Sequence, residues 1–188
     1  RDRYTITSLL GQGGPIDIFG VGERLITSKS DPVFGAVYKI AGVEKNGVWE
    51  PRIKISESVE KITNPGFKKV YRVYNEKGRA IADLLTLLEE VPDTTEPYRY
   101  IDPEQPWREL YFENCTFKEM KQLIIKDGKL LVELPTLDEL RQYVKDQLET
   151  EIWLEEQRFE NPHRHYLDMS PGYYRMKMDL LNRIFRKK

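Results

Sequence analysis

Two glycines near the start of the chain are spaced as in backbone turns that hold phosphate. Residues 16–19 (Ile-Asp-Ile-Phe) resemble a short apolar strand, and Gly20-Val21-Gly22-Glu23-Arg24 follows it directly. Glycine leaves no Cβ in the way of a ligand. If a helix begins at the next residues, its first N–H groups converge and suit an anion, to which Arg24 would add a charge-assisted contact. The spacing predicts a phosphate site formed by Gly20, Val21, Gly22, Glu23 and Arg24, although two glycines after a strand are often only a turn.

The cysteine and the two histidines are candidates for nucleophilic or metal chemistry. Cys115 is the single cysteine of the chain, which excludes an internal disulfide and a multi-cysteine zinc site. A catalytic thiol needs a nearby histidine, and none is close to Cys115 in sequence. His163 and His165 could form half a metal site, but a surface or loop-packing pair is the commoner arrangement. These residues therefore predict neither a catalytic residue nor a metal site.

Charged residues further along the chain have both a functional and a structural interpretation. Arg52 and Lys54 are two residues apart and would share one face of a strand. They could line an anionic pocket, or they could form a solvated strand face paired with Glu50 or Glu57. The acidic residues of the region 138–156 are interpreted as a solvated helix face without an acid–base pair: Asp138, Glu139, Glu149, Glu151, Glu155 and Glu156.

The phosphate candidate must be positioned by the elements at the start of the chain. Residues 4–10 place three apolar side chains on one helical face, and Gly11, Gly13 and Gly14 stop that helix before Pro15. The strand at 16–19 then completes one αβ step of an α/β architecture. Too few residues precede this step to build the rest of a sheet or barrel. We therefore expect the last part of a larger enzyme, with residues 1–33 ending its barrel.

Residues 34–134 are predicted to form a β-rich module of antiparallel hairpins. Residues 34–44 and 49–56 flank an Asn-Gly turn, which is a strong hairpin signal. Residues 68–74 and 79–88 flank a second turn, and residues 121–125 and 129–133 flank a third. The proline- and acid-rich stretch 89–108 is predicted to be a connection.

Residues 135–188 are predicted to be helical. Thr136 and Glu139 match a capping box, and the apolar pattern after them predicts a helix that runs to about Glu156. Ser170-Pro171 is typical of the start of a second helix, whose end carries the cations Arg183, Arg186, Lys187 and Lys188. The fold class expected is α/β, with α+β character in this portion.

Composition excludes several classes of protein. Apolar residues make up 39% of the 188 positions and charged residues 32%, with a formal net charge of −1. This balance gives no general attraction to nucleic acid or to an anionic membrane. We expect no signal peptide, and the sequence has no apolar run of the ~20 residues that a membrane span needs. A single cysteine fits a reducing, cytoplasmic setting.

Several dispersed motifs, in order along nearly the whole chain, resemble nicotinate phosphoribosyltransferase in its long bacterial form. The motifs are residues 14–22, 27–39 and 51–54, Lys61-Ile62-Thr63-Asn64-Pro65-Gly66, Ala80-Ile81-Ala82-Asp83, Asp102-Pro103-Glu104-x-Pro106-Trp107, and Arg158-Phe159-Glu160-Asn161-Pro162-His163. A set of motifs in the same order is far more specific than the glycine turn alone.

This resemblance implies an enzyme that couples nicotinate to phosphoribosyl pyrophosphate, with ATP hydrolysis and Mg²⁺, in cytoplasmic NAD salvage. It implies a homodimer and a type II phosphoribosyltransferase fold, in which residues 16–19 form a late barrel strand. Gly20-Val21-Gly22 would then hold the ribosyl 5′-phosphate, flanked by Glu23 and Arg24. Many members have Thr where this chain has Glu23. The family's catalytic histidine and Mg²⁺ ligands lie upstream of this turn, so we expect residues 1–188 alone to be inactive.

Two other classes of function remain open. One is a non-catalytic β-rich interaction or dimerisation module, to which the first αβ step is only a structural appendage. The other is a nucleic-acid-binding β domain, which the near-neutral charge disfavours.

Overall fold

The computed structural model describes residues 2–29, 32–33, 35–58, 61–158 and 160–186. The chain divides into two compact units, Arg1–Tyr38 and Lys39–Lys188. Some positions that the sequence predictions cover lie outside the described residues: 1, 30–31, 34, 59–60, 159 and 187–188. The division into segments 1–33, 34–134 and 135–188 stays a prediction.

The first unit contains two short helices. Helix α1 (Arg3–Gly11) begins at Asp2, whose side chain accepts a hydrogen bond from the Thr5 amide. The chain then turns through Gly13 at a φ of +75°, a conformation that favours glycine. Helix α2 (Glu23–Ile26) is a single turn that begins after Gly22. The helix predicted at residues 4–10 is confirmed.

The strand predicted at residues 16–19 is not formed. These residues have no regular secondary structure, and Ile18 is 87% exposed. A strand requires a neighbour that takes its N–H and C=O groups, and the described residues of the first unit include no other strand. The apolar composition was therefore insufficient to produce a strand in this unit.

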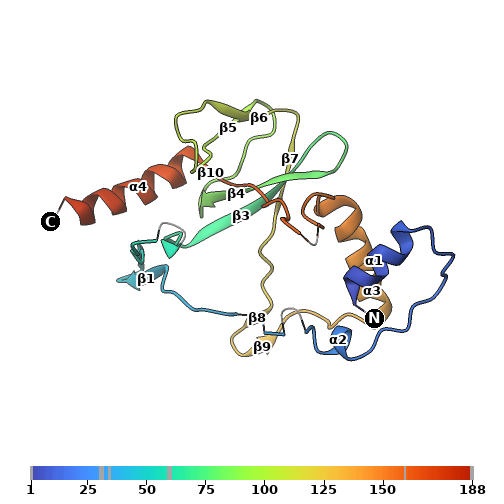
Figure 1. Ribbon diagram of the computed structural model, residues 1–188. Helices are drawn as coiled ribbons and strands as arrows, with labels where there is room; N and C mark the ends of the chain where they lie inside the picture. The colour runs from blue at the N-terminus through green and yellow to red at the C-terminus, as the bar shows by residue number, and fades with distance from the viewer. Residues whose placement is uncertain (1, 30–31, 34, 59–60, 159, 187–188) are drawn as a thin grey trace. The chain divides into compact units, whose positions relative to one another are not determined.

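The second unit is built on a four-stranded sheet in the order β10-β4-β3-β7 (Figure 1). Strands β3 (Lys68–Tyr74) and β4 (Ala80–Leu87) form the predicted central hairpin. Strand β7 (Thr116–Glu119) pairs antiparallel with β3, and β10 (Leu167–Met169) pairs parallel with β4. Segments from both ends of this unit thus meet in one sheet.

Three smaller hairpins accompany the sheet. Strands β1 (Gly42–Lys45) and β2 (Val48–Pro51) meet at Asn46 and Gly47, both of which have positive φ as tight hairpin turns require. Strands β8 (Ile125–Lys126) and β9 (Lys129–Leu130) form the other predicted hairpin. Both hairpins are confirmed, but their strands are shorter than predicted.

The hairpin of β5 (Tyr98–Tyr100) and β6 (Leu110–Phe112) was not predicted. Residues 89–108 were interpreted as a connection, which is wrong for 98–100. The loop between the two strands is long, so the sequence carries no short turn signature to reveal the pairing.

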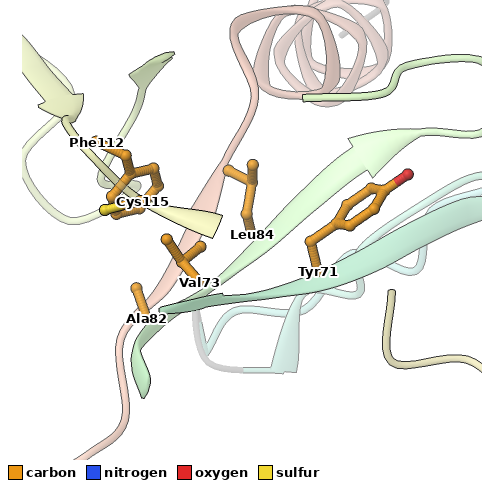
Figure 2. Close-up of a cluster of buried hydrophobic side chains, with 6 residues drawn as sticks. All are labelled: Tyr71, Val73, Ala82, Leu84, Phe112 and Cys115. Carbon is orange, nitrogen blue, oxygen red and sulfur yellow. The ribbon is translucent and has the colours of Figure 1, made fainter. Parts of the chain in front are cut away.

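Each face of the sheet packs its own cluster of apolar side chains. Figure 2 shows the first cluster, to which β3, β4, β6 and the segment before β7 contribute: Tyr71, Val73, Ala82, Leu84, Phe112 and Cys115. The second cluster joins Leu85 and Met169 to Tyr173 of α4 (Pro171–Phe185). Period-two alternation along β3 and β4 assigns neighbouring residues to opposite clusters.

The two C-terminal helices start where the sequence predicts. The capping box of Thr136 and Glu139 opens α3 (Leu137–Asp146), and Ser170 caps α4. The helical path after α3 continues only as a π-helical turn over Gln147–Glu151, and Ile152 is extended. The prediction of a helix to about Glu156 is therefore wrong. No helix among the described residues is both long and apolar enough to cross a membrane.

Candidate functional site

The glycine turn leads into helix α2 in the first unit. Gly22 caps this helix through its carbonyl, which accepts hydrogen bonds from the amides of Leu25 (3.0 Å) and Ile26 (3.3 Å). The first amides of a helix have no partner within it. A Cβ built on Gly20 or Gly22 would meet no atom within 4 Å, and neither glycine has a positive φ. Packing within this unit does not demand glycine at either position.

Arg24 and Glu23 have different surroundings from those that a bound phosphate would give them. The Nη1 atom of Arg24 lies 2.7 Å from Oδ2 of Asp2, in an ion pair on the surface of the unit. The hydrogen bonds that Asp2 accepts from Thr5, together with Arg24, keep the pKa of the Asp2 carboxyl below its usual value. Glu23 lies in the first turn of α2, where the positive end of the helix dipole stabilises a carboxylate.

A cavity of about 430 Å³ lies beside this turn. Val21 and Arg24 line it, whereas Gly20, Gly22 and Glu23 are not among its lining residues. Two further cations, Arg3 and Lys29, also line it, together with one carboxylate, that of Asp2. Three cations and one carboxylate make the cavity suitable for an anion.

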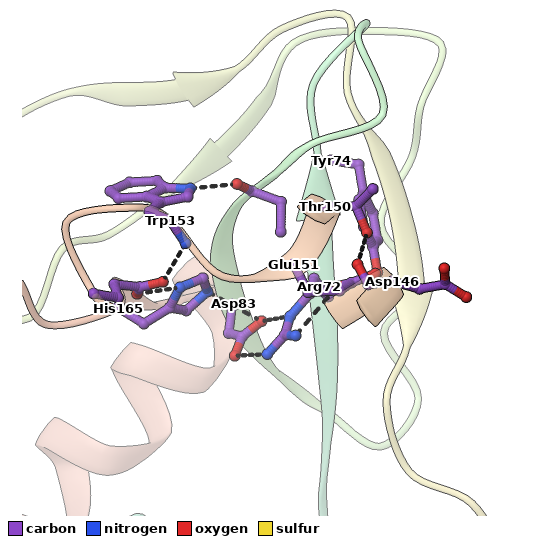
Figure 3. Close-up of polar contacts among 10 residues, drawn as sticks. Arg72, Tyr74, Asp83, Asp146, Thr150, Glu151, Trp153 and His165 are labelled. Atoms are coloured by element: carbon purple, nitrogen blue, oxygen red, sulfur yellow. Dashed lines mark hydrogen bonds and ion pairs between the residues drawn. The ribbon is translucent and has the colours of Figure 1, made fainter. Parts of the chain in front are cut away.

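A second polar cluster lies in the Lys39–Lys188 unit, on β3, β4 and the segment before β10 (Figure 3). Arg72 donates to both carboxylate oxygens of Asp83, at 2.8 and 3.1 Å. Its third contact is with Glu151 at 3.2 Å. Glu151 also accepts a hydrogen bond from the hydroxyl of Tyr74 at 2.8 Å.

His165 extends this cluster. Its Nδ1 atom lies 2.8 Å from Glu156, and its Nε2 atom lies 3.6 Å from Asp83. The Asp83 carboxylate, and then Glu156, raise the pKa of His165 against the opposing effect of burial. Burial alone would raise the pKa of Asp83, but contacts with His165 and Arg72 lower it. Both shifts favour the charged form of the group concerned.

The sequence interpretation of two acidic residues in this cluster is wrong. Glu151 and Glu156 were assigned to a solvated helix face, but Glu151 is buried against Arg72 and Glu156 holds His165. The chain leaves the helical path after Glu151, which removes the periodicity on which the prediction depended. The register of the predicted β3–β4 hairpin, which places Arg72 opposite Asp83, was the one signal that could have revealed this site.

Three other candidates have structural surroundings. Arg52 forms an ion pair with Glu50, as the solvated alternative predicted, and lies just after β2 rather than in it. The backbone amide of Lys54 donates to Thr63 at 2.9 Å. The Cys115 thiol is buried, and burial raises its pKa. Among the described residues, no three His, Cys, Asp or Glu side chains are grouped so as to hold a metal ion.

The fold is a mixed α+β domain with several hairpins and a C-terminal helix, and known proteins share it. Residues 67–177, more than half of the chain, match the family described as Nicotinate phosphoribosyltransferase C-terminal domain. The chain therefore belongs to the nicotinate phosphoribosyltransferase family. The resemblance proposed from the dispersed motifs is confirmed.

Individual relatives agree with this assignment. The chain is 34% identical over 184 residues to nicotinate phosphoribosyltransferase of Bacillus subtilis (strain 168), covering 97% of this chain and 37% of that protein. The Caenorhabditis elegans protein of the same name is 34% identical over 174 residues, covering 90% and 30%. The crystal structure of human Nicotinic Acid Phosphoribosyltransferase has the same fold, with a TM-score of 0.59 at 23% identity, over 70% of this chain and 25% of that one. The chain thus spans about a third of the length of these relatives.

Proposed function

We propose that this chain is the C-terminal part of an enzyme that joins nicotinate to phosphoribosyl pyrophosphate, driven by ATP hydrolysis, to give nicotinate mononucleotide and pyrophosphate. Its membership of the family supports this, since relatives that carry the name match nearly the whole chain. The proposal includes a cytoplasmic homodimer that works in NAD salvage. Residues 1–188 alone are proposed to lack turnover, because transfer reactions require several positioned groups at once.

Within that enzyme, we propose that residues 20–24 bind the 5′-phosphate of the ribosyl group. The cavity that Val21 and Arg24 line, with its excess of cations, is the observation that carries this proposal. A bound phosphate would replace Asp2 as the ion-pair partner of Arg24. The carboxylate of Glu23 would then point away from the phosphate. We also propose that residues 16–19 become a strand where the other strands of a barrel lie beside them.

Mg²⁺ is implied by the family, but the described residues do not fit a metal site. No step of the reaction is therefore assigned to a metal ligand in this chain. ATP likewise belongs to the proposed reaction of the whole enzyme.

The phosphate proposal is tested by titrating the chain with inorganic phosphate and following backbone amide resonances. We expect saturable shifts at residues 20–25, weakened roughly fivefold by Arg24→Gln, which removes a charge-assisted contact. Arg141→Gln, at an exposed pair on α3, is the matched control and should leave the shifts unchanged. In the longer enzyme, Arg24→Gln should raise KM for phosphoribosyl pyrophosphate and leave KM for nicotinate unaffected.

Two results would contradict this proposal. One is phosphate shifts that are absent from residues 20–25 or indifferent to Arg24→Gln. The other is an unchanged KM for phosphoribosyl pyrophosphate in the longer enzyme.

A non-catalytic interaction module remains the second candidate function. The observation that favours it is the exposed apolar face of α3, to which Leu137, Leu140 and Val144 contribute. An assay of nicotinate mononucleotide formation from nicotinate, ATP and phosphoribosyl pyrophosphate on the longer protein separates the two candidates, since only the enzyme makes this product.

A further inference from the structure

Asp168 is a buried carboxylate in the middle of β10. It is 5% exposed. Its register partner on β4 is Leu84, so it faces the same side of the sheet as the first apolar cluster, whereas Met169 faces the second. Among the residues that the structure describes, none donates a hydrogen bond to Asp168 or forms an ion pair with it. A buried carboxylate without such partners is costly.

Two cavities meet at Asp168. They have volumes of about 580 and 530 Å³, and both are lined by Asp102, Gln105, Tyr166 and Asp168. These volumes fall within the range of small-molecule sites. The carboxylate therefore faces a space that a ligand could occupy.

Aromatic side chains form part of the wall of the first cavity. Tyr100 and Phe112 are stacked with their ring centroids 3.9 Å apart, and Tyr111 and Tyr166 also line this space. Aromatic faces attract cations through their quadrupole. A carboxylate beside such faces is the arrangement that recognises a cationic group with an apolar body.

The cations near these cavities make contacts away from Asp168. Lys177 donates to the side-chain oxygen of Asn64 at 2.8 Å, and Arg108 donates to Gln105 at 3.3 Å. Arg164 is exposed, and His165 contacts Glu156 and Asp83. The neighbouring acids Asp102, Glu104 and Glu113 add negative charge to the lining. Among the described residues, Asp168 therefore has no cation in hydrogen-bond or ion-pair contact, and the charge of His165 acts on it only from a distance.

We propose that Asp168 and the cavities around it bind a small organic cation, with a guanidinium or primary ammonium group on the carboxylate and an apolar body against the aromatic wall. The substrates of the proposed transfer reaction are anions, which the Asp168 carboxylate would not attract. A metal ion is disfavoured, because the described residues group no three metal-binding side chains.

The protonation of Asp168 supplies a specific signature of such binding. Burial, and then the charge of Asp102, raise the pKa of Asp168 to about 7, against the lowering effect of His165. A bound cation favours the ionised carboxylate, so binding should release protons and strengthen as pH rises from 6 to 8. The other titratable side chains that line the cavities include His163, His165, Cys115, Tyr100, Tyr111 and Tyr166.

The test is calorimetric titration of the full chain with propylguanidinium and with butylammonium. Measurements at pH 6 and 8, in buffers of different ionisation enthalpy, count the protons released. We expect saturable binding that is tighter at pH 8 and about tenfold weaker in Asp168→Asn. Asp138→Asn, at an exposed residue of α3, is the matched control and should bind like the unaltered chain. Asp102→Asn removes a like charge near Asp168 and should therefore lower the pKa of Asp168. This variant should still bind the cation, but the midpoint of the rise in affinity with pH should move to lower pH.

Several results would overturn the proposal. These are the absence of saturable binding at pH 8, equal affinity in a folded Asp168→Asn, and binding without proton release. Tighter binding of an arginine-containing dipeptide than of propylguanidinium would indicate that the cavity binds an arginine side chain of a protein and not a small molecule. If Asp168→Asn fails to fold, an unshifted pH midpoint in Asp102→Asn would still contradict it.

Discussion

At the residue scale, the Arg72–Asp83 ion pair joins the two central strands of the sheet. The two residues face each other across β3 and β4, and their side chains are only 17% and 18% exposed. Arg72 offers a planar fork that matches the carboxylate of Asp83 bidentately. Its remaining contact with Glu151 attaches the segment after α3 to the sheet.

Replacing Arg72 should destabilise the second unit. Arg72→Met leaves the carboxylates of Asp83 and Glu151 buried without their cation, which should lower the free energy of unfolding by about 3 kcal/mol. Urea unfolding followed by circular dichroism measures this. Adding Asp83→Asn to Arg72→Met should recover part of the loss. Arg141→Met, at the exposed pair with Asp138, should have little effect; an equal effect at both sites would refute the argument.

At the element scale, the start of α4 is fixed by a polar junction with the end of β4. The Glu90 carboxylate accepts hydrogen bonds from the Leu87 amide at 2.9 Å and from the hydroxyl of Ser170. Ser170 in turn accepts a hydrogen bond from the Tyr173 amide at 3.0 Å. A Cβ on Gly172 would lie 2.2 Å from Glu90 Oε1. Glycine at position 172 therefore allows the carboxylate to approach the helix.

The sign of a Gly172→Ala change should depend on Glu90. Alone, it should destabilise the unit by about 1–2 kcal/mol, because Glu90 must give up its hydrogen bonds to make room. In a Glu90→Ala background, the same change should stabilise by up to about 1 kcal/mol, the usual gain of alanine over glycine in a helix. Thermal unfolding of the four proteins of this double-mutant cycle measures both values. If Gly172→Ala changed stability in the same direction with and without Glu90, the approach of the Glu90 carboxylate to residue 172 would not be what requires glycine there.

At the scale of the whole molecule, the side chains of Asp83, His165 and Asp168 contribute to how stability depends on pH. The lowered pKa of Asp83 gives stability that is present above its ordinary value of 3.8 and is lost as pH falls through the folded value. The raised pKa of His165 gives stability that is present below 6.5 and is lost as pH rises through the folded value. The raised pKa of Asp168 gives stability that is lost between 3.8 and about 7.

The second unit should therefore be more stable at pH 5 than at pH 8. Above pH 4 the ionisation of Asp168 and then the deprotonation of His165 both lower the free energy of unfolding, whereas Asp83 contributes only below that range. Urea unfolding across pH 4–9 gives the profile. Asp168→Asn should remove most of the decline between pH 5 and 7, while Asp138→Asn should retain it. Greater stability at pH 8 than at pH 5 would contradict the assignment.

Local signals revealed much of the fold but less of the site. The hairpin turns at Asn46 and at Asp127, the capping box at Thr136 and the start of α4 at Ser170 each depend on neighbouring residues, and each is confirmed. The β5–β6 pairing depends on residues joined by a long loop, and it was missed. The phosphate role of residues 20–24 stays a prediction.

The sequence by itself determined the family, through motifs dispersed along the chain, and the elements whose signals lie within a few residues. Only the tertiary structure decided that Glu151 and His165 reach Arg72 and Asp83 from segments about 80 residues away. Only the tertiary structure showed that Asp168 is buried facing two cavities. The physical reason is that charge partners and burial depend on which distant segments pack together, whereas turns and caps depend on local backbone geometry.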